Sequence, residues 1–229
     1  MLARTTPLPP AFLPPPAVVV RCPVSAPAPD FARLLGAAAW SRLAPAVRRR
    51  FAATPAVDRP IHYHGLMHEV RSSPAGWALA RLCRIVGAPF ALHDGTDVPV
   101  TITLRSRDAG AAIAWERTYR YADHAATVVR SEKRLGADGA LIEQVGGGFA
   151  MRLDLREADG ALHFHSRGYC WRIGRWVVPV PGWLSPGVAH VIHQDLGGGR
   201  FRFAMTIRHA LFGTLFSQDG VFHEEGTTP

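Results

Sequence analysis

Apolar residues recur at every second position through much of the chain after residue 97, a period that is typical of β-strands with one buried face. Arginine and threonine fill many intervening positions, as in the stretches 98–105, 149–156 and 200–208. Such alternation indicates an antiparallel sheet that packs one face on a core and leaves the other in water. It argues against a parallel doubly wound sheet, in which strands alternate with helices.

Turn sequences separate these stretches at hairpin spacing. Ala-Asp-Gly occurs at 137–139 and 158–160, and glycine triplets occupy 146–148 and 197–199. Glycine and aspartate favour the left-handed backbone of tight hairpins, so each turn is expected to join neighbouring strands. Neither glycine triplet opens a helical pattern, which argues against phosphate-binding loops.

Helical patterns come before most of the strands. Asp30 is a suitable N-cap for a first helix, and Pro45 starts a second short helix. A strand of mixed polarity is expected over 61–71, followed by a helix from Pro74. We therefore predict an α+β fold. It is a strongly curved antiparallel β-meander or a partly closed barrel of about eight strands, with two N-terminal helical elements packed at one end.

The N-terminal stretch differs from the rest because prolines interrupt it throughout. They break the continuous apolar helix that a signal peptide requires. We predict a disordered Pro-rich leader over 1–29, a single domain over 30–224 and a disordered tail over 225–229. No apolar run reaches the roughly 20 residues of a membrane span. The 3 widely spaced cysteines suit a reducing compartment, so we expect a cytoplasmic protein.

The chain carries 26 basic and 18 acidic residues, a formal net charge of +8. The basic residues are almost all arginine and are dispersed along the sequence. One dense run, 48–50, ends a predicted helix, where positive charge complements the helix dipole. This distribution argues against a nucleic-acid-binding surface.

One charged residue falls in the apolar phase of its strand. Arg117 is in phase with Trp115 and Tyr119. A charge on that face must be paired or must border a hydrated cavity, and Glu143 and Glu132 are the expected partners. Two interpretations stay open: a buried ion pair that fixes strand register, or an anchor for the carboxylate or phosphate group of a ligand.

The segment 171–186 is apolar, aromatic and rich in proline, so we expect no regular structure in it. Three arrangements fit this composition: a flap over a cavity mouth, an exposed patch for a partner or a membrane surface, or a loop packed on the end of the core. The predicted ligand-binding residues are Trp115, Arg117, Tyr119, Glu143, Trp176 and Trp183.

Alternating histidines raise the question of a metal site. His62 and His64 project to one face of a strand, and His68 joins them if Gly65 does not bulge the strand. Two ligands at this spacing can share a metal. The sequence contains no His-Glu-x-x-His motif and no Cys/His spacing of a structural zinc site. We predict no cofactor and keep a metal at these histidines as an alternative.

A second His-x-His pair, His163 and His165, lies on another predicted strand. His190 and His193 could complete a set of ligands with it. However, His163 and His165 occupy the arginine-bearing, solvated phase of their strand. Surface histidines are therefore the simpler interpretation.

Several short motifs follow one another along the chain. They are Phe31-x-x-Leu34-Leu35-Gly36 with Trp40 and Leu43, Tyr63-x-Gly65, Trp77-x-Leu79-Ala80-Arg81-Leu82, Val98-Pro99-Val100-Thr101-Ile102, Trp115-x-Arg117, Leu141-Ile142-Glu143, Pro179-x-Pro181-x-Trp183-Leu184-x-Pro186 and Gly220-x-Phe222. In this order they resemble a bacterial family known as domain of unknown function 4166, over residues 31–222. The resemblance implies no established activity. Some members look fused to a dinucleotide-binding, saccharopine-dehydrogenase-like domain, which is not visible here. Gln218 departs from the family pattern, in which an aromatic residue is expected at this position.

These patterns favour a non-catalytic or accessory domain that binds a small hydrophobic or amphipathic molecule inside the curved sheet, with Arg117 as polar anchor and 171–186 as lid. Two alternatives stay open. One is a metal-assisted enzyme that uses His62, His64 and His68. The other is an interaction module that contacts a redox or membrane protein through residues 171–186. The Gly-x-Ser-x-Gly motif of many hydrolases is absent from the sequence.

Overall fold

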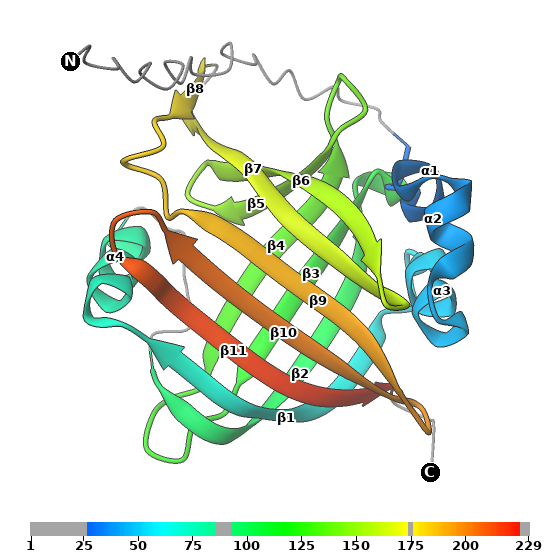
Figure 1. Ribbon diagram of the computed structural model, residues 1–229, viewed down its shortest axis with the longest axis horizontal. Helices are drawn as coiled ribbons and strands as arrows, with labels where there is room; N and C mark the ends of the chain where they lie inside the picture. The colour runs from blue at the N-terminus through cyan, green and yellow to red at the C-terminus, as the bar shows by residue number, and fades with distance from the viewer. Residues whose placement is uncertain (1–26, 86–92, 174–175, 225–229) are drawn as a thin grey trace, which may run out of the picture.

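The computed structural model describes residues 27–85, 93–173 and 176–224, and its strands wrap into a barrel (Figure 1). Neighbouring strands lie in the order β6-β5-β4-β3-β2-β1-β11-β10-β9-β7-β8, and β6 also pairs with β7. The strands are β1 (Ile61–Ser72), β2 (Gly95–Arg107), β3 (Ala112–Tyr119), β4 (Thr127–Leu135), β5 (Leu141–Gly146), β6 (Phe149–Ala158), β7 (Ala161–Ile173), β8 (Trp176–Val180), β9 (Val188–Gly197), β10 (Arg200–His209) and β11 (Gly213–Glu224). The β6–β7 pairing closes ten of these strands into a barrel and leaves β8 as an extra strand.

The predicted antiparallel, strongly curved sheet is confirmed. The estimate of about eight strands was too low, and the barrel is closed where a partly closed one was predicted. The number of strands was underestimated because some strands carry polar residues at their inward positions. On β4, for example, Ser131 and Lys133 are buried while the adjacent positions carry Arg130 and Glu132. The apolar period of two is therefore weak in such strands, and the sequence underestimates their number.

The helices lie at both ends of the barrel (Figure 1). They are α1 (Phe31–Leu35), α2 (Ala37–Arg42), α3 (Pro45–Ala52) and α4 (Pro74–Ile85), with a 3₁₀ turn, η1, at Asp108–Gly110. As predicted, the Asp30 side chain caps α1 by accepting a hydrogen bond from the Arg33 backbone N–H, and Pro45 begins α3. The prediction of helices at one end was wrong for α4. β1 crosses the barrel between α3 and α4, so α4 follows at the opposite end.

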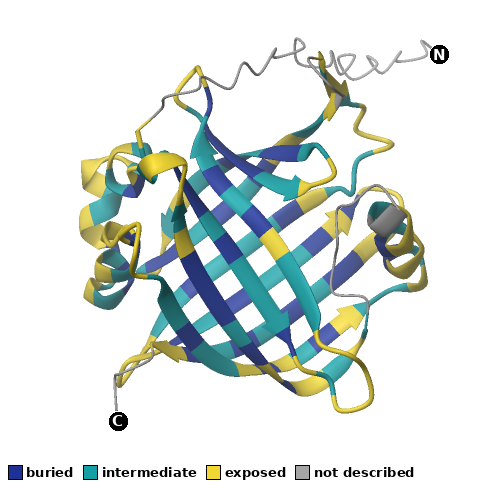
Figure 2. Cartoon of the chain, turned by 180° about the vertical axis from the view of Figure 1, so that it is seen from behind, coloured by how far each residue is buried: buried dark blue, intermediate teal, exposed yellow. Residues whose placement is uncertain are grey.

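The buried residues alternate along the strands with partly exposed and exposed ones (Figure 2). On β2 the predicted apolar phase is confirmed, because Val98, Val100, Ile102 and Leu104 are all buried. The α1–α3 end is closed by apolar side chains from these helices that join the core, including Phe31, Val47 and Phe51. The alternation therefore produces a barrel with an apolar inner face.

The predicted hairpin turns are confirmed. Residues 137–139, 146–148, 158–160 and 197–199 connect β4–β5, β5–β6, β6–β7 and β9–β10. Gly148 shows why glycine is required: its φ is +81°, and a Cβ there would lie 2.3 Å from the carbonyl oxygen of Arg172.

The segment 171–186 contains regular structure, contrary to the prediction. Its first residues belong to β7, and Trp176–Val180 form β8. Pro179 lies opposite Cys170 at the edge of the sheet, where the missing N–H of proline is tolerated. β7 is long enough to pair with β9 through residues 162–165 and with β8 through residues 169–173.

Two predicted regions lie outside the described residues: the tail over 225–229, and the leader over 1–29 except for its last three residues. Within the part of the chain that the structure describes, no helix is long and apolar enough to cross a membrane.

Candidate ligand-binding cavity inside the barrel

A cavity of about 300 Å³ lies inside the barrel. Its wall is largely apolar and comes from the inner faces of the strands and from α4. Examples are Leu79, Met151, Phe164, Val191, Met205 and Phe216. The curved sheet therefore encloses space beside α4 and is not filled throughout by its own side chains.

The cavity reaches the surface between α4 and the segment that follows β8. Leu82 on α4 and Leu184 in that segment border the cavity, and each is 57% exposed. Val180 and Pro186 also line it. The segment 171–186 thus contributes to the wall beside the mouth.

The predicted binding residues fall into two groups. Trp115, Arg117 and Tyr119 point into the barrel, as their phase on β3 indicated, and Glu143 on β5 does so as well. Trp176 and Trp183 are 65% and 74% exposed and are not part of the cavity wall. Three of the six predicted residues, Arg117, Tyr119 and Glu143, therefore line the cavity. Trp115 is buried in the core and is not part of the cavity wall, and Trp176 and Trp183 lie outside the barrel interior.

Lys133 and Glu143 form a buried ion pair in the cavity wall. They lie opposite each other on β4 and β5, and Lys133 Nζ donates a 2.8 Å hydrogen bond to Glu143 Oε1. Burial alone would raise the pKa of Glu143, but Lys133 and Arg117 outweigh it and hold that pKa below its ordinary value. Burial lowers the pKa of Lys133, and Glu143 opposes this shift.

Among the described residues, Arg117 makes no direct ion pair with Glu143 or Glu132, and it acts on Glu143 only through space. Glu143 is bonded to Lys133, and Glu132 is bonded to Arg134. The sequence pattern did not identify Lys133 as a partner, because apolar and polar residues do not alternate clearly on β4. A lysine on such a strand is expected to be solvated.

Arg117 lies in the barrel interior. Its Nη1 donates a 3.4 Å hydrogen bond to Ser131 Oγ, and its Cζ lies 5.7 Å and 5.6 Å from the ring centres of Trp115 and Phe203. Its Nε is buried and has no hydrogen-bond partner among the described residues. A hydrogen bond from Ser131 also reaches Glu143, so this hydroxyl lies between the two charged groups.

Tyr119 and Gln218 add a neutral polar pair to the wall. Tyr119 Oη donates a 2.9 Å hydrogen bond to Gln218 Oε1, and Gln218 Nε2 lies 3.7 Å from Met205 Sδ. Burial raises the pKa of Tyr119, so this hydroxyl stays protonated. Gln218, noted in the sequence as a departure from the family pattern, thus has a definite partner inside the barrel.

His193 also points inward, among aromatic rings. Its ring centre lies 5.0 Å from that of Phe51 and 5.2 Å from that of Phe203. Burial, reinforced by nearby cations that include Arg50 and Lys133, holds its pKa well below 6.5. His193 is therefore neutral and is separated by the sheet from His190, which lies on the outer face.

The structure does not gather His62, His64 and His68 into one group. Their Nδ1 atoms have separate neighbours: Thr103 Oγ1 at 3.2 Å, Thr101 Oγ1 at 3.4 Å and Asp97 Oδ1 at 2.9 Å, respectively. The pairing of β1 with β11 shifts register between Met67 and Glu69, and this irregularity at His68 breaks the strand period. Among the described residues, three histidines do come together as one group of possible ligands: His163, His165 and His190.

The fold and the cavity define a class: a closed antiparallel β-barrel with an apolar interior that contains buried charged groups. A protein-family model described as Domain of unknown function (DUF4166) matches residues 43–222. The chain belongs to this family, and the resemblance drawn from its motifs is confirmed. A search of curated proteins gives no significant match.

Proposed function

We propose that the chain binds a small amphipathic anion in the barrel cavity, as a non-catalytic or accessory binding domain. The observation that carries this proposal is Arg117, a partly buried cation whose Nε atom is buried and has no hydrogen-bond partner among the described residues. A carboxylate or phosphate group can accept hydrogen bonds from guanidinium N–H groups, and the apolar wall around it suits the rest of the molecule.

The charges in the wall support an anion over a neutral or cationic ligand. Arg117 and Lys133 share one carboxylate, that of Glu143, so the interior has one positive charge in excess. An uncompensated charge in a low-dielectric interior is costly, and a bound anion would reduce that cost. A cationic ligand would increase it.

The cavity volume limits the size of the ligand. About 300 Å³ lies at the lower end of the range for small-molecule pockets, roughly 300–1,000 Å³. A medium-chain fatty acid is therefore a suitable probe, whereas a two-chain lipid is too large to be enclosed.

Calorimetric titration of the full chain with octanoate, octanol and octylamine tests the proposal. We expect octanoate to bind most tightly and octylamine most weakly. In Arg117→Leu the advantage of octanoate over octanol should disappear. Arg105→Leu is the matched control, because Arg105 is an exposed arginine on the neighbouring strand β2. Equal octanoate binding by Arg117→Leu and the unmodified chain would refute Arg117 as the anchor.

Exposed apolar side chains beside the mouth favour a second role. Trp176, Val178 and Trp183 are all exposed and flank the cavity-lining residues of the same segment. Clustered exposed apolar side chains are typical of an interaction surface. Because amphipathic anions partition into membranes, we propose that this segment contacts a lipid surface when ligand is exchanged; a partner protein at 171–186 is the alternative.

Co-sedimentation with phosphatidylcholine–phosphatidylglycerol vesicles tests this second role. The unmodified chain should sediment with the vesicles, and Trp176→Ser/Trp183→Ser should not. Since both tryptophans are exposed, the double variant should retain the fold and octanoate binding. If the unmodified chain stays in the supernatant, the proposed contact with a lipid surface is wrong. A partner protein that binds residues 171–186 would then be the interpretation to test.

A further inference from the structure

Three histidines meet on the outer face of the barrel, where β7 and β9 pair. His165 lies directly opposite His190 across the two strands, and His163 is two residues from His165 on the same face. Leu162 and Phe164, at the alternate positions of β7, are buried in the barrel. The backbone hydrogen bonds of the two strands therefore hold three imidazoles as neighbours, because facing residues of an antiparallel pair lie about 4.5–5.5 Å apart at Cβ.

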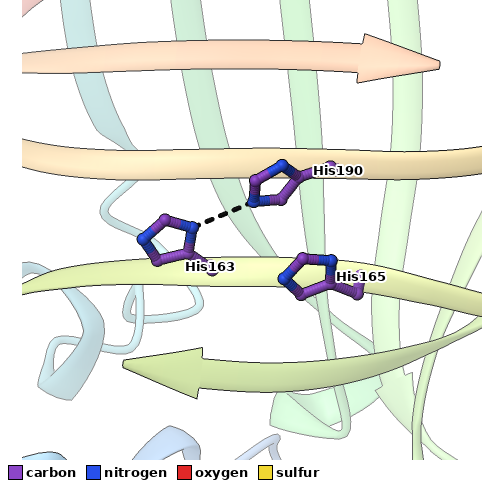
Figure 3. A group of neighbouring side chains, drawn as sticks. All are labelled: His163, His165 and His190. Carbon is purple, nitrogen blue, oxygen red and sulfur yellow. Dashed lines mark hydrogen bonds between the residues drawn. The ribbon is translucent and has the colours of Figure 1, made fainter. Parts of the chain in front are cut away.

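The ring nitrogens lie close enough to share one ion. His163 Nδ1 is 2.9 Å from His190 Nε2, and one ring nitrogen from each of His163, His165 and His190 lies within 4.8 Å of the others. Figure 3 shows the three rings grouped beside the two strands, with the contact between His163 and His190 dashed. The ring of His165 is stacked on that of His190, with centres 4.2 Å apart.

Small side-chain rotations would give a metal its usual geometry. Tetrahedral Zn²⁺ with Zn–N bonds of about 2.0–2.1 Å places its ligand nitrogens roughly 3.3 Å apart. The His163–His190 separation is already near this value. His165 needs only a rotation of its partly exposed ring to bring its nitrogen nearer.

The surroundings disfavour protonation of two of the rings. Burial, reinforced by Arg156 and His163, lowers the pKa of His165, and burial also lowers the pKa of His190. A metal binds the neutral imidazole, so these surroundings are compatible with the grouping of ring nitrogens that the structure shows. The arginines nearby reduce affinity for a cation, but Arg167 is itself paired with Asp154.

We propose that His163, His165 and His190 form a binding site for a divalent transition metal such as Zn²⁺ on the outside of the barrel. Three imidazole ligands leave a fourth coordination position for water or another donor. Imidazole suits zinc, copper and nickel better than it suits magnesium or calcium. The site lies on the opposite face of the sheet from the ligand cavity and does not depend on the proposed function.

Calorimetric titration of the tag-free full chain with ZnCl₂ tests the site. We expect one Zn²⁺ per chain. His163→Ala, His165→Ala and His190→Ala should each weaken binding at least about 10-fold, because even losing a hydrogen-bond partner of a metal ligand costs about that much. Cobalt should replace zinc and give the intense visible absorption of a tetrahedral site, which the variants lose. His62→Ala/His64→Ala is the matched control, since these residues repeat the His-x-His spacing on β1, and zinc binding should not change.

Three outcomes would overturn the proposal. They are no zinc binding by the unmodified chain, binding that persists in the triple variant, or loss of binding in the His62/His64 control alone. Circular dichroism without metal shows whether each variant is folded, and His190→Asn replaces His190→Ala if the alanine variant is not. Zinc should raise the melting temperature of the unmodified chain and of the control, and should leave that of His163→Ala unchanged.

Discussion

Where α1–α3 cover the barrel, aromatic rings fill the interior; beside α4, the same barrel encloses a cavity lined by charged and apolar side chains. At the covered end Phe51 lies against Phe31, with ring centres 5.2 Å apart, and against Phe164, at 5.7 Å. A barrel of this many strands is too wide for its own side chains to fill completely. The comparison shows that helices from outside the sheet complete the packing at one end and leave room for a ligand at the other.

The largest expected effect tests the packed end. Phe51→Ala should lower the free energy of unfolding by about 3–5 kcal/mol, the usual cost of removing a buried phenylalanine ring. Phe149→Ala is the matched change beside the cavity. Because Phe149 is only partly buried and borders existing space, it should cost less than half as much. Urea denaturation measures both, and equal losses would contradict the difference between the two ends.

The next effect concerns the charges in the wall. Glu143→Gln should cost about 3 kcal/mol, because it leaves the buried Lys133, and the nearby Arg117, without a carboxylate. Replacing the pair together, as Lys133→Met/Glu143→Leu, should recover much of that loss, since no half of an ion pair then remains. If the double variant is as unstable as Glu143→Gln, the Lys133–Glu143 pair stabilises the fold by more than neutralising its own two charges.

His193 lies where the aromatic packing meets the cavity, and it predicts a pH dependence. Its folded pKa lies well below 6.5, so the unfolded state binds more protons once the pH falls below about 6.5. Stability should therefore fall toward acid pH until the folded pKa is reached, by up to about 1.4 kcal/mol per pH unit from this group. His193→Phe should reduce that slope in urea denaturations between about pH 5 and 7. An unchanged slope would mean that other groups titrate there.

The smallest expected change in stability is at Arg117. Arg117→Leu removes the excess positive charge of the cavity wall, whose direct hydrogen bond is to the Ser131 hydroxyl, and it leaves Glu143 paired with Lys133. The free energy of unfolding should therefore stay the same or rise by about 1 kcal/mol. Octanoate affinity should fall about 10- to 100-fold, since a hydrogen bond to a charged group contributes about 1.5–3 kcal/mol. A large loss of stability would instead favour the structural interpretation, in which Arg117 fixes strand register.

Local patterns predicted the parts of the fold that depend on neighbours in sequence. The period of two on β2, the cap at Asp30 and the glycine turns were all readable in this way. The inward direction of Arg117 was readable from its phase with Trp115. Closure of the barrel could not be predicted from local patterns, because the pairing of β6 with β7 is compatible with both an open and a closed sheet.

The cavity wall and the histidine group depend on how neighbouring strands are paired. The spacing of residues along the sequence does not determine this strand register. The His163-x-His165 spacing was visible, but the position of His190 opposite His165 follows from how β7 pairs with β9. In the same way, Glu143 faces Lys133 because of the β4–β5 register. Polar residues that face inward also weaken the alternation by which a strand is recognised, so the wall of the cavity was the hardest part of the barrel to predict.

Lys133, buried in its pair with Glu143, is the only lysine in the sequence. Lysine-directed reagents therefore find no lysine side-chain amine at the surface of the folded barrel. The rate at which an acylating reagent modifies residue 133 would report how often the wall opens, read at one position by mass spectrometry. Any change that loosens the barrel, or any ligand that holds it closed, should change that rate without the need for an introduced label.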